Sequence, residues 1–153
     1  MVQARREIRI ERPAESVFRF VGTDFYRNYP RWSPEVKHLE LLDGPELRPG
    51  SRARQVRVDY RRRSESTFRV TALEPPVYLE FESLESPWFR VRYEVQPERV
   101  GRCARLRFTF ELLRLEVYMR PFRRLIQKAV DDGACSITYR IKTLVEREID
   151  PPR

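Results

Sequence analysis

Few side chains in this sequence could carry nucleophilic or metal chemistry. The chain has a single histidine, His38, and two cysteines, Cys103 and Cys135, which are far apart in sequence. One histidine and two separated cysteines do not make a zinc site, and no serine stands at a recognisable spacing from His38 for a Ser–His triad. His38 also alternates with leucines in the strand-like run 36–42, which predicts that it points away from the core. We therefore expect no catalytic residue, no metal and no cofactor.

Tyrosine and arginine are the remaining groups that could orient or protonate a ligand. In the strand-like run 51–60, alternation places Arg54, Val56 and Tyr60 on the face that we predict to point inward. Tyr93 has the inward parity in its own run, and a buried phenol needs a hydrogen-bond partner. Two alternatives stay open: an early bulge would turn Arg54 out to solvent, and a register shifted by one residue would turn the other face inward. That other face carries Gln55, Arg57 and Asp59.

The segment NYPRWSPEV, residues 28–36, combines aromatic side chains with two prolines. Because Pro30 and Pro34 disfavour helical conformation at the residues before them, we predict a loop that is not helical. Trp32 lies between the two prolines, and we expect it to pack over one end of the interior and to share in the wall of a ligand site. The only proton-transfer group nearby is the outward-facing His38, so we do not expect a catalytic loop.

The hydrophobic pattern predicts one order of elements, β-α-α-β-β-β-β-β-β-α. A short strand at 7–11 precedes two short helices, at 13–22 and 24–28. Six runs with a period of two follow, at residues 36–42, 51–60, 66–73, 77–84, 89–95 and 105–112. Their alternation is typical of an antiparallel sheet with one wet face, on which we expect cross-strand Arg–Glu pairs. From Pro121 the period returns to 3.6, which predicts one long helix to Glu148.

The predicted C-terminal helix has to cover the apolar face of the sheet. Its apolar stripe consists of Phe122, Ile126, Ala129, Gly133, Ile137, Arg140, Ile141 and Leu144. Since glycine weakens a helix, we expect Gly133 to mark a close approach to the sheet. The predicted architecture is an α+β helix-grip fold, in which a curved seven-stranded antiparallel sheet wraps around this helix. The inward side chains would line a ligand site: Trp32, Arg54, Val56, Tyr60, Phe68, Phe81, Phe89, Tyr93, Phe108, Phe110, Phe122 and Ile126.

Composition narrows the class of protein. A chain of 153 residues is expected to form one domain, residues 1–153, with an ordered core from about residue 5 to 148. No run is long enough for a transmembrane helix and the first residues lack an apolar segment, so we expect a cytoplasmic protein. The net charge is +8, but the basic residues are spread along the whole chain, which favours solvated faces over a nucleic-acid partner. The oligomeric state, monomer or homodimer, stays open.

From Ile8 to Glu146 the chain resembles the START-like (Bet v 1-like, SRPBCC) superfamily, and within it the bacterial polyketide cyclase/dehydrase-type proteins. The segments that carry the resemblance are PAESVF, YPRWSPEV, LLDGP, PGSRAR, VTALEPP and LVERE, in this order. The resemblance implies a cavity between sheet and helix that binds lipids, sterols, polyketides or quinone-type molecules. Members share this cavity rather than one chemistry.

Three functions are compatible with these features. The first is a non-enzymatic binder or carrier of a small hydrophobic molecule, which requires a cavity of about 300 Å³ or more. The second is a polyketide cyclase/aromatase or dehydratase with Arg54, Tyr60 or Tyr93 as proton donors. The third is a lipid-handling protein in weak contact with an anionic membrane surface through YMRPFRRLIQK, residues 118–128, although an ordinary amphipathic helix start also explains this segment.

Overall fold

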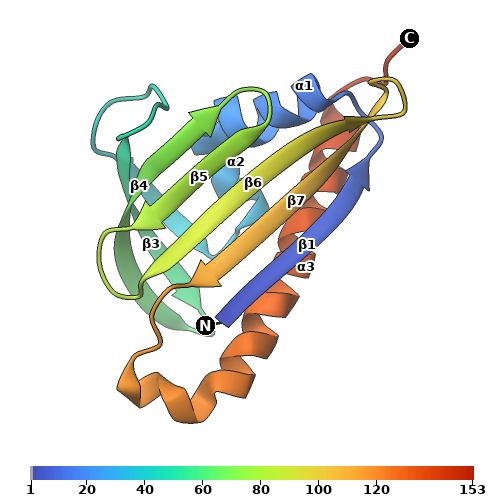
Figure 1. The fold of residues 1–153 in the computed structure, drawn as a ribbon. Coiled ribbons are helices and arrows are strands. Elements are labelled where there is room, and N and C mark those ends of the chain that lie inside the picture. The colour runs from blue at the N-terminus through green and yellow to red at the C-terminus, as the bar shows by residue number, and fades with distance from the viewer. Residues whose placement is uncertain (1) are drawn as a thin grey trace.

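The computed structural model describes residues 2–153 and consists of a curved antiparallel sheet with the helices packed on one face (Figure 1). The seven strands are β1 (Val2–Ile10), β2 (Val36–Leu41), β3 (Arg52–Asp59), β4 (Arg62–Glu74), β5 (Tyr78–Ser83), β6 (Phe89–Glu98) and β7 (Cys103–Leu112). Their order in the sheet is β1-β7-β6-β5-β4-β3-β2, so the first and second strands form the two edges. Every neighbouring pair is antiparallel.

Five helical segments complete the fold. They are α1 (Ala14–Phe18), a π-helical turn η1 (Arg19–Thr23), α2 (Phe25–Trp32), a 3₁₀ turn η2 (Val117–Phe122) and α3 (Arg123–Glu148). The predicted α+β helix-grip fold is confirmed, with short helices after the first strand and a long helix at the C-terminal end. The period-two and period-3.6 patterns place these elements in the right order because each strand and helix has one apolar face to bury. Their bounds differ from the prediction in places: β1 begins at Val2 and not near residue 7, and α2 ends at Trp32 and not at Asn28.

The outer face of the sheet carries the predicted cross-strand ion pairs. Arg90 lies opposite Glu82 in the β5–β6 register, and its Nε donates to a Glu82 carboxylate oxygen at 2.6 Å. Arg92 pairs with Glu111 of the next strand at 2.9 Å. His38 is exposed on this face, as predicted. Such pairs fix strand register and each contributes little to stability while solvent screens them.

The prediction that residues 28–36 are not helical is wrong for the first part of the segment. Helix α2 continues through Trp32 with Pro30 inside it. A proline inside a helix removes one backbone hydrogen bond and costs about 3 kcal/mol. Burial of the Phe25, Tyr29 and Trp32 side chains on one face of α2 offsets this cost, since each buried aromatic contributes about 1.5–3 kcal/mol.

Helix α3 runs behind the β1 edge of the sheet and packs mainly on β1 (Figure 1). Its buried side chains are Ala134, Thr138, Ile141 and Val145. This buried stripe shares only Ile141 with the predicted one and lies about a quarter-turn around the helix from it. The prediction weighed large apolar side chains, whereas packing against β1 uses the small Ala134 and Thr138, which allow close approach.

Candidate functional site

A chain of hydrogen bonds connects α2 to the inner face of β3. The Tyr29 hydroxyl donates to Gln55 Oε1 at 2.8 Å, and Gln55 Nε2 donates to Ser66 Oγ at 3.1 Å. All three residues are buried. Burial raises the pKa of Tyr29, so its phenol keeps its proton at neutral pH. These groups are therefore satisfied polar contacts in an otherwise aromatic interior.

Arg57 extends this polar chain towards solvent. Its guanidinium donates to both carboxylate oxygens of Asp59 at 3.2 Å and to the Tyr29 hydroxyl at 3.4 Å. Burial acts to lower the pKa of Arg57, but Tyr29, Asp59 and Glu35 together raise it by more, so the group stays charged. The Arg57 side chain is nevertheless 29% exposed, so solvent reaches part of it.

The register alternative with Gln55, Arg57 and Asp59 inward is the one that the structure adopts, and the prediction of the opposite face is wrong. Arg54 points outward and forms ion pairs with Glu40 and Glu65. Val56 is buried, but it lies on the same outer face, opposite the exposed His38. The outward Arg54 finds two carboxylates there, whereas an inward Arg54 would lose them.

Tyr60 is not part of a strand, and its predicted inward position is also wrong. It forms a two-residue turn with Arg61 between β3 and β4, with φ values of 50° and 67°. Positive φ at both central positions is typical of the tight hairpin turn that matches strand twist. The Tyr60 side chain is consequently 92% exposed.

Most of the predicted aromatic site residues lie together in the interior. Trp32, Phe68, Phe81, Phe89, Tyr93 and Phe108 are buried, and Phe110 and Ile126 are half-buried. Phe25 of α2 fills the space between these rings, with its centroid 5.2 Å from Phe81 and 4.8 Å from Tyr29. Trp32 Nε1 donates to the Tyr93 hydroxyl at 3.2 Å. This side of the interior is therefore occupied by side chains of the protein itself.

Helix α3 presents a second face beside its buried stripe. Ile126, Val130, Gly133, Ile137, Arg140 and Leu144 follow one another at intervals of three or four residues, and all are half-buried. We call these six residues the half-buried stripe. A Cβ atom added to Gly133 would meet nothing within 4 Å, so the predicted close approach at this glycine is wrong. Free space therefore borders the half-buried stripe at Gly133, whereas Val130, Ile137 and Leu144 pack partly against the core.

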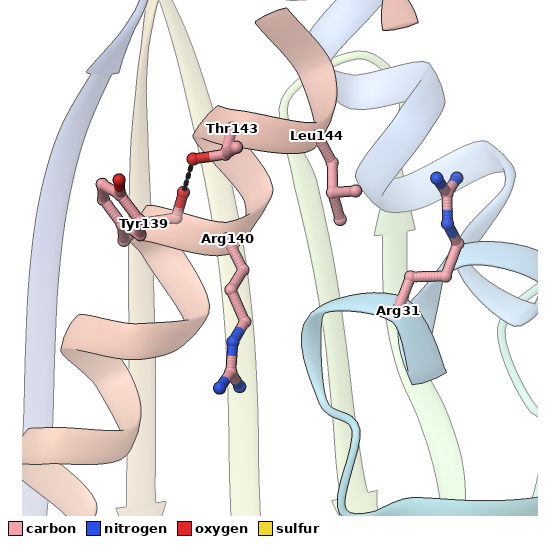
Figure 2. A pocket seen from close by; sticks show the side chains of 5 residues that line it. All are labelled: Arg31, Tyr139, Arg140, Thr143 and Leu144. Atoms are coloured by element: carbon pink, nitrogen blue, oxygen red, sulfur yellow. Dashed lines mark hydrogen bonds between the residues drawn. The ribbon is translucent and has the colours of Figure 1, made fainter. Parts of the chain in front are cut away.

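A pocket of about 250 Å³ opens between α2 and α3. Arg31 of α2 lines it, together with Tyr139, Arg140, Thr143 and Leu144 of α3. Figure 2 shows Leu144 projecting from α3 towards the side where Arg31 of α2 lies, whereas Arg140 extends along α3. The pocket lies at the C-terminal end of the half-buried stripe. Its volume is below the cavity of about 300 Å³ or more that the carrier hypothesis requires, so this pocket alone does not meet that requirement. A ligand here would be small or would extend along the stripe.

The two arginines of this pocket differ in their partners. Arg31 forms an ion pair with Glu148 and lies 5.6 Å from the Phe20 ring centroid. Arg140 has no ion-pair partner among residues 2–153. A half-buried cation without a counter-charge is suited to an anionic or carbonyl oxygen of a ligand. The sequence pattern placed Arg140 and Leu144 on one stripe, but no sequence signal indicated Arg31.

The predicted Phe122 is 56% exposed and does not reach this pocket, because η2 and the start of α3 project beyond the end of the sheet (Figure 1). Within residues 2–153, no cluster of three or more histidine, cysteine or acidic side chains could hold a metal ion. No helix in the described part of the chain combines the length and apolar character that crossing a bilayer requires.

Comparison with known proteins places this geometry in a family. The model of the family described as polyketide cyclase/dehydrase and lipid transport matches residues 1–146. No curated protein matches the chain in sequence.

Several solved structures share the fold. The protein TTHA0849 from Thermus thermophilus is 21% identical, with a TM-score of 0.74 over 97% of this chain and 99% of that chain. The ZhuI aromatase/cyclase from Streptomyces sp. R1128 is 14% identical, with a TM-score of 0.77 over 97% of this chain and 95% of that chain. The di-domain aromatase/cyclase BexL of the BE-7585A biosynthetic pathway is 23% identical, with a TM-score of 0.73 over 99% of this chain and 48% of that chain. At these identities the similarity shows the fold.

Proposed function

The chain belongs to the polyketide cyclase/dehydrase and lipid transport family, and on that premise we propose that it binds and carries a small hydrophobic molecule. The observation that carries the proposal is the open pocket between α2 and the half-buried stripe of α3. The apolar part of a lipid, polyketide or quinone-like ligand would lie along Ile137 and Leu144. Arg140 would bind an acidic or carbonyl oxygen at the mouth.

Native mass spectrometry of the freshly purified protein tests whether such a ligand is retained. We expect an added mass that disappears on organic extraction. Two naphthalene probes then test the site in the stripped protein: anilinonaphthalene sulfonate, which is anionic, and its uncharged analogue N-phenyl-1-naphthylamine. Both should bind, as followed by fluorescence, because both present an apolar ring system.

Matched variants locate the binding site. Gly133→Leu fills the free space beside the half-buried stripe, whereas Ser136→Leu puts the same side chain on an exposed position of the same helix. We expect at least about a tenfold loss of affinity for both probes with the first variant only, equivalent to about 1.4 kcal/mol. Arg140→Gln should weaken the sulfonate probe about tenfold and leave the uncharged probe unchanged. Equal affinities in all variants would place the ligand elsewhere and contradict the proposal.

A second candidate function is cyclisation or aromatisation of a polyketide. The observation that favours it is the inward polar chain of Arg57, Tyr29 and Gln55. Arg57 could polarise a ketone, and the protonated Tyr29 could donate to the alkoxide that forms when a carbon–carbon bond closes the ring. This replaces the predicted proton donors Arg54 and Tyr60, which face solvent.

The test is the product distribution from a linear polyketide released by a minimal polyketide synthase. The wild-type protein should shift the distribution towards one ring pattern, and Arg57→Met or Tyr29→Phe should abolish the shift. Tyr139→Phe is the control, because it removes a hydroxyl from the pocket mouth and not from the polar chain. If neither Arg57 nor Tyr29 changes the products, carrier function alone remains.

A further inference from the structure

Two exposed segments at one end of the molecule combine aromatic or apolar side chains with arginines. The first is the tip of the β3–β4 hairpin, residues 60–63, with the sequence YRRR. The second is residues 117–128, which include η2 and the first turns of α3. We call the two segments together the basic end. In Figure 1 both lie at the end of the sheet where the N terminus is marked, and η2 extends beyond the strands.

The apolar side chains of the basic end are unusually accessible. Val117, Tyr118, Phe122 and Leu125 are 56% to 73% exposed, and Tyr60 is almost fully exposed. Phe122 and Leu125 are three residues apart, so they project from the same side of the helix start. η2 has no buried residue. These side chains belong neither to the core nor to the pocket described above, so their exposure needs a partner to explain it.

The cations of the basic end are largely unpaired. Residues 117–128 contain four basic residues and no acidic one. Arg120, Arg123 and Arg124 have no ion-pair partner among residues 2–153, in contrast to the paired arginines on the outer face of the sheet. In the hairpin, only Arg63 forms an ion pair, with Glu65. A surface with exposed aromatic groups and unpaired cations is complementary to negative charge above an apolar layer.

The two segments are adjacent in space. Asp132 raises the pKa of Lys128 through a hydrogen bond and its charge, and Tyr60 adds to this rise. Together with the common position of the two segments at one end of the sheet in Figure 1, this places the hairpin tip near the first turns of α3, although the two are far apart in sequence. The basic end is consequently one surface, with apolar side chains on both of its parts.

We propose that the basic end docks on an anionic lipid bilayer, with Tyr118, Phe122 and Leu125 inserted at the headgroup level and the neighbouring arginines on lipid phosphates. A second copy of the chain fits this surface poorly, because two such surfaces would bring like charges together. A nucleic acid would satisfy the arginines but would leave Phe122 and Leu125 in water. Docking would bring the bilayer next to Ile126, where the half-buried stripe begins, but it does not depend on the proposed ligand.

Vesicle co-sedimentation tests the docking. The probe is vesicles of phosphatidylcholine alone or with about a third of phosphatidylglycerol, at low and high salt. The wild-type protein should sediment with the anionic vesicles at low salt, less at high salt, and not with neutral vesicles. Arg120→Glu/Arg123→Glu/Arg124→Glu should lower the partition coefficient about 100-fold or more, since each basic residue near an anionic surface contributes about fivefold.

A control variant with the same change in charge is Arg19→Glu/Arg69→Glu/Arg102→Glu, whose residues are exposed outside the basic end. It should lower the partition coefficient by less than about tenfold, because distant charges are screened. Tyr118→Ser/Phe122→Ser/Leu125→Ser should reduce sedimentation tenfold or more without any change in charge. Circular dichroism and the melting temperature should show that all three variants are folded.

Three results would overturn the proposal. The first is no sedimentation of the wild-type protein with anionic vesicles at low salt. The second is an equal loss in the Arg120 and Arg19 triple variants, which would mean that net charge and not the basic end is responsible. The third is a dimer in light scattering that the apolar triple variant abolishes, which would make this surface an interface between copies. Docking does not depend on the proposed ligand site. Loss of probe binding in Gly133→Leu would therefore not change the interpretation of these three results.

Discussion

The inner face of the sheet has two sides that are packed in opposite ways. On the α2 side, Phe25, Tyr29 and Trp32 interlock with aromatic rings of the strands, and polar groups are paired with one another. On the α3 side, Gly133 borders free space, a pocket opens beside Leu144, and Arg140 has no ion-pair partner among residues 2–153. The same fold therefore has one side filled by side chains and one side with space left beside the helix. This difference supports the proposed binding site on the α3 side over the alternative at Tyr29 and Arg57, since a filled wall cannot admit a ligand without unpacking.

The largest effect should come from removing a buried ring on the filled α2 side, which we call the closed side. Phe25→Ala removes a fully buried ring that contacts rings of α2 and of three strands. We expect the free energy of unfolding to fall by about 3–5 kcal/mol. Urea denaturation measures it, and Phe122→Ala, at an exposed position, should cost less than about 0.5 kcal/mol. A small loss for Phe25→Ala would mean that the α2 side is not well packed.

An added methyl group should also be costly on the closed side. A Cβ atom at Gly22 would lie 2.4 Å from the Phe18 ring, which is itself buried. Gly22→Ala should therefore lower the free energy of unfolding by about 1–3 kcal/mol through overpacking. Thermal and urea unfolding measure this loss. Stability equal to that of the wild type would contradict the close contact.

The buried phenols should make the closed side sensitive to alkaline pH. Burial raises the pKa of both Tyr29 and Tyr93. Above the unfolded pKa of about 10, the unfolded chain releases these protons while the folded chain retains them. The unfolded state then binds fewer protons, so stability is full below pH 10 and falls above it by up to about 1.4 kcal/mol per pH unit for each tyrosine. In Tyr29→Phe, the slope of unfolding free energy against pH should be shallower in this range.

The smallest effect is expected on the α3 side, which we call the open side. There the substitution should raise the free energy of unfolding. Gly133→Ala places a methyl group in free space and removes a glycine from the interior of α3. It should stabilise the protein by about 1 kcal/mol. The same type of substitution should therefore lower the free energy of unfolding in Gly22→Ala and raise it in Gly133→Ala. Destabilisation by Gly133→Ala would show that α3 approaches the sheet closely after all.

The alternation of residues within strands predicted the sheet well, because a strand with one buried face leaves a period of two in its sequence. Its weak point was β3, where apolar and polar residues occur on both faces. There the register depends on whether Gln55 finds Tyr29 and Ser66, and these partners lie on other elements. Because such partners cannot be read from a single strand, the sequence offered Arg57 only as part of the alternative register. It gave no indication of Arg31.

Helix α3 shows the limit of periodicity in another way. Its sequence has two adjacent stripes, and the more apolar one, with Ile126, Ile137 and Leu144, was predicted to be the buried one. The structure buries the stripe with Ala134 and Thr138 instead. Close packing against β1 favours small side chains, and hydrophobicity alone does not measure closeness.

The sequence by itself determined the helix-grip architecture, the outward position of His38 and most of the aromatic residues that the strands contribute to the interior, because these follow from local periodicity and residue type. The tertiary structure decided which face of β3 points inward, which face of α3 is buried, and where free space remains. Those choices depend on side chains far apart in sequence meeting at ångström distances, and a one-residue shift along a strand or a quarter-turn of a helix reverses them.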